Sequence, residues 1–337
     1  MARLGGTPAW GAGRDRGQKG ARKQMFGSAR KGSAGGWTAV EAGPDGIIAA
    51  SVRAPAGGRA KPQVLKCGYM SDTELDPGTL AQIARKVTTS GFRWTLPLNR
   101  GDYKVFVVPE PTVPAEEMAQ SVRWSLGSML DFPVDDAAID WMSIPTKQLP
   151  QRPPHIYAIA ASREVVSRRT EVFKKAKIPL EAVDIRETAQ RNIALLLQKP
   201  GEGLGMVALN ARGVQITFTF EGELYLDRYI EEPIDPLLTG DEEARERVFD
   251  RITLQVQRSI DFMTRTYSFI PVGRIVVAPM PAPIPLRDYL AANVAEHVEM
   301  LDLATILDIS ETPELGEDEA QSRFFTAIGA ALRSAEG

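Results

Sequence analysis

Cysteine and histidine are scarce in this chain of 337 residues, which has one cysteine, Cys67, and two histidines, His155 and His297. A single cysteine cannot form an intramolecular disulfide, and this composition is typical of a reducing compartment. The three residues lie far apart and show none of the spacings that hold structural zinc. No Ser-His-Asp or Cys-His pattern has supporting context. We therefore expect neither a metal site nor nucleophilic catalysis.

Long hydrophobic runs are also missing. No apolar stretch approaches the roughly 18 residues of a membrane span, and no apolar core of a signal peptide lies near the start. Hydrophobic residues make up 43% of the chain and charged residues 25%, which are usual proportions for a globular protein. The length predicts two domains, or one domain of two lobes.

Charge is distributed unevenly. Residues 1–34 carry eight Lys or Arg side chains against Asp15 alone, although the whole chain has a net charge of −3. Ten acids and no Lys or Arg occur between Asp288 and Ser322. Most of the chain therefore lacks the positive charge of a nucleic-acid-binding protein, and we expect no nucleic-acid partner.

The basic tail, residues 1–34, is predicted to be disordered, because a segment rich in Gly, Ala, Arg and Lys cannot bury enough apolar surface. It either contacts anionic lipid or nucleic acid, or is simply solvated. Met25 offers a second plausible translation start, since the sequence from Met25 leads directly into the first predicted strand.

Two similar strand-turn-strand segments open two halves of the chain. The first comprises strands 37–42 and 46–53, and the second comprises strands 206–211 and 213–220. A third strand, at 63–69 or 223–230, extends each hairpin into a three-stranded meander. Helices and single strands follow each meander, a pattern that predicts two mixed-sheet α/β lobes. Paired hairpins of this kind are the layout of an actin-like nucleotide-binding fold.

The remaining elements define the expected domains. Asp76 and Pro77 predict the start of a helix over 77–89, and an apolar stripe predicts a long helix that includes Val248 to Tyr267. A final helix is expected over 324–333. We expect a first lobe over 35–199, a small α/β subdomain inserted within it at about 76–148, and a second lobe over 205–337.

Several short blocks resemble the MSHA pilus biogenesis family MshI, a relative of the type IV pilus assembly protein PilM. The blocks are residues 117–126, 132–145, 187–192, 221–228, 254–262 and 327–333. The resemblance covers about residues 25–337. It implies an actin-like fold with a subdomain inserted in the first lobe, and a scaffold role in the cytoplasm at the inner face of the inner membrane. PilM holds a short cytoplasmic peptide at the N-terminus of a single-pass membrane protein, PilN, so the resemblance also implies a PilN-like partner in the pilus assembly platform.

The first hairpin turn departs from the Asp-x-Gly pattern that holds metal-bound phosphate in this fold. It reads Glu41-Ala42-Gly43. A carboxylate and a glycine remain, but Pro44 follows and removes one backbone N–H from the phosphate cradle.

The second turn departs further. Asn210 replaces the acid, Arg212 replaces the expected glycine, and Gly213 follows. Arg212 either pairs with a phosphate or is a solvated turn residue. Where a Gly-Gly loop would receive adenosine, residues 278–283 contain three prolines. We therefore expect a degenerate nucleotide site, no cofactor and no ATPase activity, with bound ATP and Mg²⁺ as the alternative.

Three tryptophans, Trp94, Trp124 and Trp141, are expected to lie in the inserted subdomain. They either line a groove for a partner peptide or form the core of the subdomain. Asp135, Asp136 and Asp140 either bind a cation or face solvent. Residues 311–319 are predicted to form a mobile acidic loop.

The combined prediction is a non-catalytic scaffold of an MSHA-type pilus platform, in which the first lobe and the inserted subdomain present a groove to an extended peptide. Three rival functions stay open. They are an active actin-like ATPase, a small-molecule kinase on the same lobes, and a nucleic-acid-binding protein that uses residues 1–34.

Overall fold

A computed structural model describes residues 35–55, 60–145, 153–210, 212–238 and 241–333. The predicted disordered tail, residues 1–34, and most of the proline-rich connector before His155 lie outside the described residues. No helix in the described part of the chain has the length and apolar character needed to cross a membrane.

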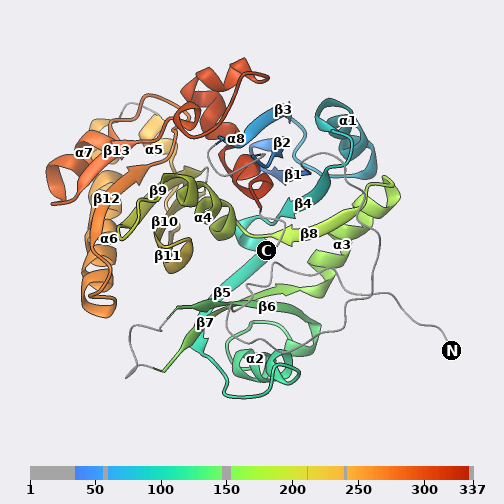
Figure 1. Cartoon of the computed structure of the whole chain (residues 1–337), viewed down its shortest axis with the longest axis horizontal. Coiled ribbons are helices and arrows are strands. Elements are labelled where there is room, and N and C mark those ends of the chain that lie inside the picture. Colours follow the sequence, from blue (N-terminus) through green and yellow to red (C-terminus); the bar gives the residue numbers. More distant parts are fainter. Residues whose placement is uncertain (1–34, 56–59, 146–152, 211, 239–240, 334–337) are drawn as a thin grey trace.

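The first lobe is built on a five-stranded mixed sheet with the order β3-β2-β1-β4-β8 (Figure 1). Its strands are β1 (Gly36–Gly43), β2 (Gly46–Arg53), β3 (Gln63–Met70), β4 (Arg93–Pro97) and β8 (Leu180–Asp184). The meander β1-β2-β3 is antiparallel, whereas β4 runs parallel to β1 and β8 runs parallel to β4.

Two helices cover the outer side of this lobe, α1 (Pro77–Val87) on β2 and β3, and α3 (Arg163–Lys175) beside β8. The predicted start of α1 is confirmed, because the Asp76 carboxylate accepts hydrogen bonds from the backbone N–H groups of Gly78 and Thr79.

The second lobe repeats the plan with a sheet of order β11-β10-β9-β12-β13. Its strands are β9 (Gly203–Asn210), β10 (Gly213–Phe220), β11 (Glu223–Ile230), β12 (Val272–Val277) and β13 (His297–Met300). Its helices are α5 (Asp235–Leu238), α6 (Glu242–Thr266) and α7 (Leu286–Asn293). The predicted stripe of the long helix is confirmed, since α6 buries it from Val248 to Met263 against the sheet.

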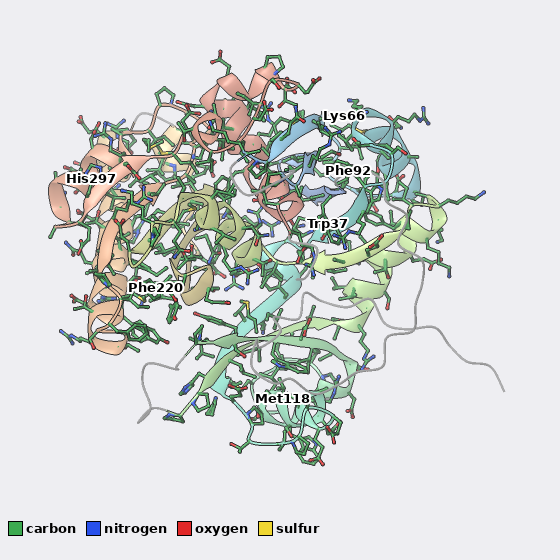
Figure 2. The ribbon with its side chains drawn as sticks, in the orientation of Figure 1. Trp37, Lys66, Phe92, Met118, Phe220 and His297 are labelled. Carbon is green, nitrogen blue, oxygen red and sulfur yellow. The ribbon has the colours of Figure 1, made fainter. Side chains whose placement is uncertain are left out.

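The inserted subdomain is a three-stranded antiparallel sheet covered by one helix, and it lies below the two lobes in Figure 1. Its elements are β5 (Tyr103–Pro109), α2 (Met118–Leu126), β6 (Ala137–Ile144) and β7 (His155–Ser162), with the order β5-β7-β6. Met118, labelled in Figure 2, belongs to its small apolar core together with Val122 and Leu126.

These bounds differ from the predicted insertion at about 76–148. Helix α1 and strand β4 belong to the first lobe, and β7, expected outside the insertion, forms the centre of the inserted sheet. Local patterns identified the strands, but sheet membership depends on pairing between residues distant in sequence.

Helices α4 (Arg186–Leu197) and α8 (Asp318–Ala331) lie between the two large sheets. Helix α4 packs on β9 and β10, α8 packs on β1 and β2, and the two helices pack on each other. The predicted second lobe, 205–337, is therefore too long at its end, because α8 covers the first sheet.

The segment before α8 also returns to the first lobe. The backbone N–H of Val64 in β3 donates to the carbonyl of Asp308 at 2.9 Å, and Leu315 is fully buried in the same apolar cluster as Val64. The predicted mobile loop over 311–319 is wrong, since residues Pro313–Gly316 form a 3-10 turn fixed by the buried Leu315.

Gly329 lies where α8 crosses α4. A Cβ atom at this position would overlap the carbonyl oxygen of Ala189, and Asn192 donates to the carbonyl of Gly329 at 2.9 Å. The two backbones thus approach as closely as a glycine allows.

We expect Gly329→Ala to lower the free energy of unfolding by roughly 1–3 kcal/mol, because the helices have to separate, although alanine is the better helix former. Gly316→Ala is the matched control, since a Cβ there meets nothing within 4 Å. Urea denaturation followed by circular dichroism measures both. Equal stability of the two variants would contradict the close crossing.

Candidate functional site

A cleft of about 480 Å³ is lined by residues of both lobes. The first hairpin turn contributes Glu41, Pro44 and Asp45 to its wall, and the second turn contributes Asn210. The proline loop after β12 contributes Ala278, Pro279 and Pro281, and α4 contributes Arg186. The structure therefore brings together the three segments that the sequence associates with nucleotide binding.

Glu41 is buried at the end of β1 and pairs with Arg186, the first residue of α4. The Arg186 guanidinium donates to Glu41 Oε2 at 3.0 Å. Burial raises the pKa of the Glu41 carboxyl, and Arg186 opposes that rise. The carboxylate expected to face a metal-bound phosphate is thus engaged in a buried ion pair.

Gly43, in the same turn, packs against Asn99. A Cβ at residue 43 would lie 3.1 Å from Asn99 Oδ1, and the Asn99 amide donates to the carbonyl of Ala42 at 2.5 Å. The absence of a side chain at Gly43 therefore leaves room for Asn99, whose hydrogen bond to Ala42 holds the turn.

In the second turn, the oxygen of the Asn210 side chain accepts a hydrogen bond from the backbone N–H of Arg212 at 3.0 Å, and one from the Tyr229 hydroxyl at 3.4 Å. A Cβ at Gly213 would overlap the carbonyl oxygen of Ile230, so this glycine permits close strand packing. Arg212 is exposed. Its Nη1 atom lies near Gly101, 3.7 Å from the point where a Cβ atom at residue 101 would be.

These side chains do not offer Mg²⁺ a set of free oxygen ligands, because Glu41 is paired and the Asn210 oxygen is already hydrogen-bonded. Within the described ranges, no group of three or more His, Cys, Asp or Glu residues could hold a metal ion. Pro279 and Pro281 have no backbone N–H to donate to a ligand.

A polar junction next to the cleft consists of the buried residues Tyr103 and Glu187 and the half-buried residues Arg100 and Asp227. The Tyr103 hydroxyl donates to Glu187 Oε2 at 2.6 Å, and Arg100 Nη1 lies 3.7 Å from Glu187 Oε1. Burial and the charge of Glu187 raise the pKa of Asp227, which accepts a hydrogen bond from Gln215. The junction joins the inserted subdomain to α4 and to β11.

Sequence reasoning missed the junction. Glu187 is fully buried, yet it resembles an ordinary acid in the first turn of a helix, where such residues are common for reasons of helix stability alone. The one available signal was the pair Arg186-Glu187 at the start of α4. Adjacent residues of a helix point in different directions, so these two opposite charges face different neighbours.

The three tryptophans do not line one groove. Trp94 lies in β4, buried in the first lobe with its ring 6.5 Å from that of Phe173, so its assignment to the insertion is wrong. Trp141 packs against the subdomain core, and Trp124 is 73% exposed on α2. The subdomain-core interpretation holds for Trp141 alone.

The expected alternatives for Asp135, Asp136 and Asp140 are also separated by the structure. Asp135 and Asp136 are exposed on a short 3-10 turn. Asp140, in β6, is largely buried, and its carboxylate accepts the backbone N–H of Trp141 at 2.9 Å. His155 begins β7, with Nδ1 2.9 Å from the carbonyl oxygen of Pro153.

Comparison with known proteins supports the fold. No protein-family model matches the sequence, and no curated protein matches it either. Among solved structures, a chain of a PilM–PilN type IV pilus biogenesis complex is similar, with 15% identity and a TM-score of 0.69 over 88% of this chain and 98% of that chain.

Two further structures are more distant. A Bacteroides thetaiotaomicron protein with an actin-like ATPase fold and unknown function is 10% identical over 84% of this chain and 96% of that chain, with a TM-score of 0.48. The cytoplasmic domain of EpsL, an inner-membrane component of the Vibrio cholerae type II secretion system, is 10% identical over 61% and 75%, with a TM-score of 0.40. The predicted actin-like fold is confirmed.

We expect Arg186→Met to lower the free energy of unfolding by about 2–4 kcal/mol, because Glu41 is left buried without its cation. The double variant Glu41→Gln/Arg186→Met removes the unpaired charge and is expected to recover part of that loss. Chemical denaturation at pH 7.5 measures both proteins. A double variant no more stable than the single one would show that the ion pair does not hold the turn.

Asp140 predicts a pH dependence of stability. Burial raises its pKa to about 7, whereas an unfolded aspartate has a pKa of about 3.9. The folded protein therefore binds the proton more tightly, and stability falls as pH rises from about 4 to about 7. Asp140→Asn is expected to gain on the order of 1–2 kcal/mol over the native protein at pH 8, and little at pH 4.5.

Asp136→Asn, at an exposed position of the adjacent turn, is the control and is expected to leave the pH profile unchanged. Urea midpoints at both pH values give the comparison. If the stability of Asp140→Asn and that of the native protein changed with pH by the same amount, Asp140 would not be the titrating group.

Proposed function

We propose that this chain is an actin-like scaffold of a type IV pilus assembly platform of the MSHA type, acting at the cytoplasmic face of the inner membrane. The observation that carries the proposal is the similarity to a chain of the PilM–PilN type IV pilus biogenesis complex, which extends over 88% of this chain and 98% of that one. The short sequence blocks that resemble MshI favour the MSHA type.

The proposed partner is the cytoplasmic N-terminal segment of a PilN-like single-pass membrane protein. An extended peptide can bind by adding to an open sheet edge, where backbone hydrogen bonds give affinity and side-chain pockets give specificity. Strand β5 is an edge strand of the inserted sheet, and it carries the exposed side chains of Lys104 and Val107, the latter 56% exposed. We place the peptide along this edge, next to the first lobe.

We further infer that the cleft does not hydrolyse ATP. Three features support this inference. Glu41 is paired with Arg186, Asn210 replaces the expected acid of the second turn, and prolines occupy the loop expected to receive adenosine. Scaffolding by a pseudo-ATPase needs the lobes and the inserted subdomain, but no chemistry in the cleft.

The scaffold proposal predicts that the full chain binds a synthetic peptide with the cytoplasmic N-terminal sequence of a PilN-like membrane protein from the same organism. Val107→Asp is expected to weaken this binding at least about tenfold, because it places a charge on the apolar edge. Leu254→Asp is the matched control, since Leu254 is 44% exposed on α6 of the other lobe. Fluorescence anisotropy with a labelled peptide measures the affinities.

No binding by a folded native chain would overturn the scaffold proposal. Equal weakening by both substitutions would retain the partner but move the peptide away from β5. Circular dichroism on each variant confirms that the comparison is between folded proteins.

A further inference from the structure

A second, smaller cavity of about 20 Å³ lies between the two hairpin turns. Three arginines from different elements line it: Arg100 just before β5, Arg186 at the start of α4, and Arg212 in the second turn. The small cavity adjoins the large cleft, since both are lined by Pro44, Asp45, Arg186 and Asn210.

The three arginines are not equally neutralised. Arg186 pairs with Glu41, and Arg100 pairs with Glu187. Arg212 makes no ion pair with any carboxylate of the described residues, and its side chain is exposed at the cavity mouth. Asp45 also lines the cavity, and Glu41 and Glu187 already engage Arg186 and Arg100, so Arg212 is the lining cation that no carboxylate of the described residues pairs with.

The charges of the inner two arginines are secure. Burial disfavours the charged form of Arg186, but Glu41, Tyr103 and Tyr229 together offset this and the pKa of Arg186 is raised. For Arg100, burial lowers the pKa and the negative charge of Glu187 raises it. The net result is again a raised pKa. The N-terminus of α4 adds a partial positive charge, because its first N–H groups point toward this end of the helix.

The arrangement favours an anion over a metal-bound phosphate. Arginine forks bind phosphate oxygens directly, in charge-assisted hydrogen bonds. A cation beside Arg212 and Arg186 would be repelled, and the nearby oxygens of Glu41 and Asn210 are already engaged. A cavity of about 20 Å³ holds roughly one water-sized group, so it takes one oxygen of the anion while the rest of the ligand stays in the cleft.

We propose that the cleft binds a small phosphorylated compound without a metal ion, through Arg212 at the cavity mouth with Arg186 and Arg100 behind it. Arg212 supplies the positive charge that a metal ion would otherwise supply, and Arg186 and Arg100 add hydrogen-bond donors. This site goes beyond the scaffold role and does not depend on the PilN-like partner.

Isothermal titration calorimetry of the full chain with sodium pyrophosphate, at 150 mM NaCl, tests the proposal in two arms. One arm contains EDTA, and the other contains Mg²⁺ in excess over pyrophosphate. We expect sub-millimolar binding in EDTA and several-fold weaker binding with Mg²⁺, because the metal neutralises the ligand that the arginines recognise.

Two substitutions complete the test. Arg212→Ala is expected to weaken pyrophosphate binding by about tenfold, the loss that corresponds to one charge-assisted contact. Arg265→Ala removes an exposed arginine of α6 and is expected to have no effect. Both positions are exposed, so an unchanged urea midpoint establishes that each variant is folded.

Three results would each overturn the proposal. They are no binding up to about 5 mM pyrophosphate, binding that requires Mg²⁺, and equal affinity of Arg212→Ala and Arg265→Ala. The second result would restore the metal-dependent nucleotide alternative. Peptide binding is measured separately, so failure of the anion site and failure of the scaffold role are distinguishable.

Discussion

The crossing of α4 and α8 is the contact on which the rest of the molecule depends. Each helix covers the inner face of one large sheet, and the two helices meet where Gly329 lies on the backbone of Ala189. The distance between the sheets, and with it the width of the cleft, is therefore fixed by two helix backbones in direct contact. Side chains of α4 extend this control, since Gln190 donates both to the carbonyl of Met206 and to Thr217 in the second sheet.

The start of α4 connects two regions that could otherwise behave independently. Arg186 faces the cleft and holds Glu41, whereas its neighbour Glu187 faces the inserted subdomain and holds Tyr103. A shift of this helix end would move both contacts together, because adjacent residues of one helix cannot be displaced separately. A ligand that displaced Arg186 in the cleft would therefore also act on the contact between Glu187 and the inserted subdomain.

The sequence predicted those features that depend on residues close together in the chain. The cap at Asp76, the α6 stripe and the two hairpins are periodic or short-range signals, and the structure has them where they were expected. The errors concern residues whose neighbours are distant in sequence. Trp94 was assigned to the insertion because it falls within the expected range 76–148, and α8 was assigned to the second lobe because it follows the strands of that lobe in the chain. Glu187 was overlooked because nothing local distinguishes a buried acid from a solvated one.

The path of the chain after β13 has a consequence for biosynthesis. Residues 303–331 leave the second lobe, run along β3 and end as the helix that covers β1 and β2. Strands β1 and β2 are synthesised long before α8, so the face of the first sheet that α8 covers lacks this helix until α8 has been made. The first lobe is not a contiguous stretch of polypeptide, so a chain cut before α8 would expose the apolar surface of β1 and β2 that this helix covers.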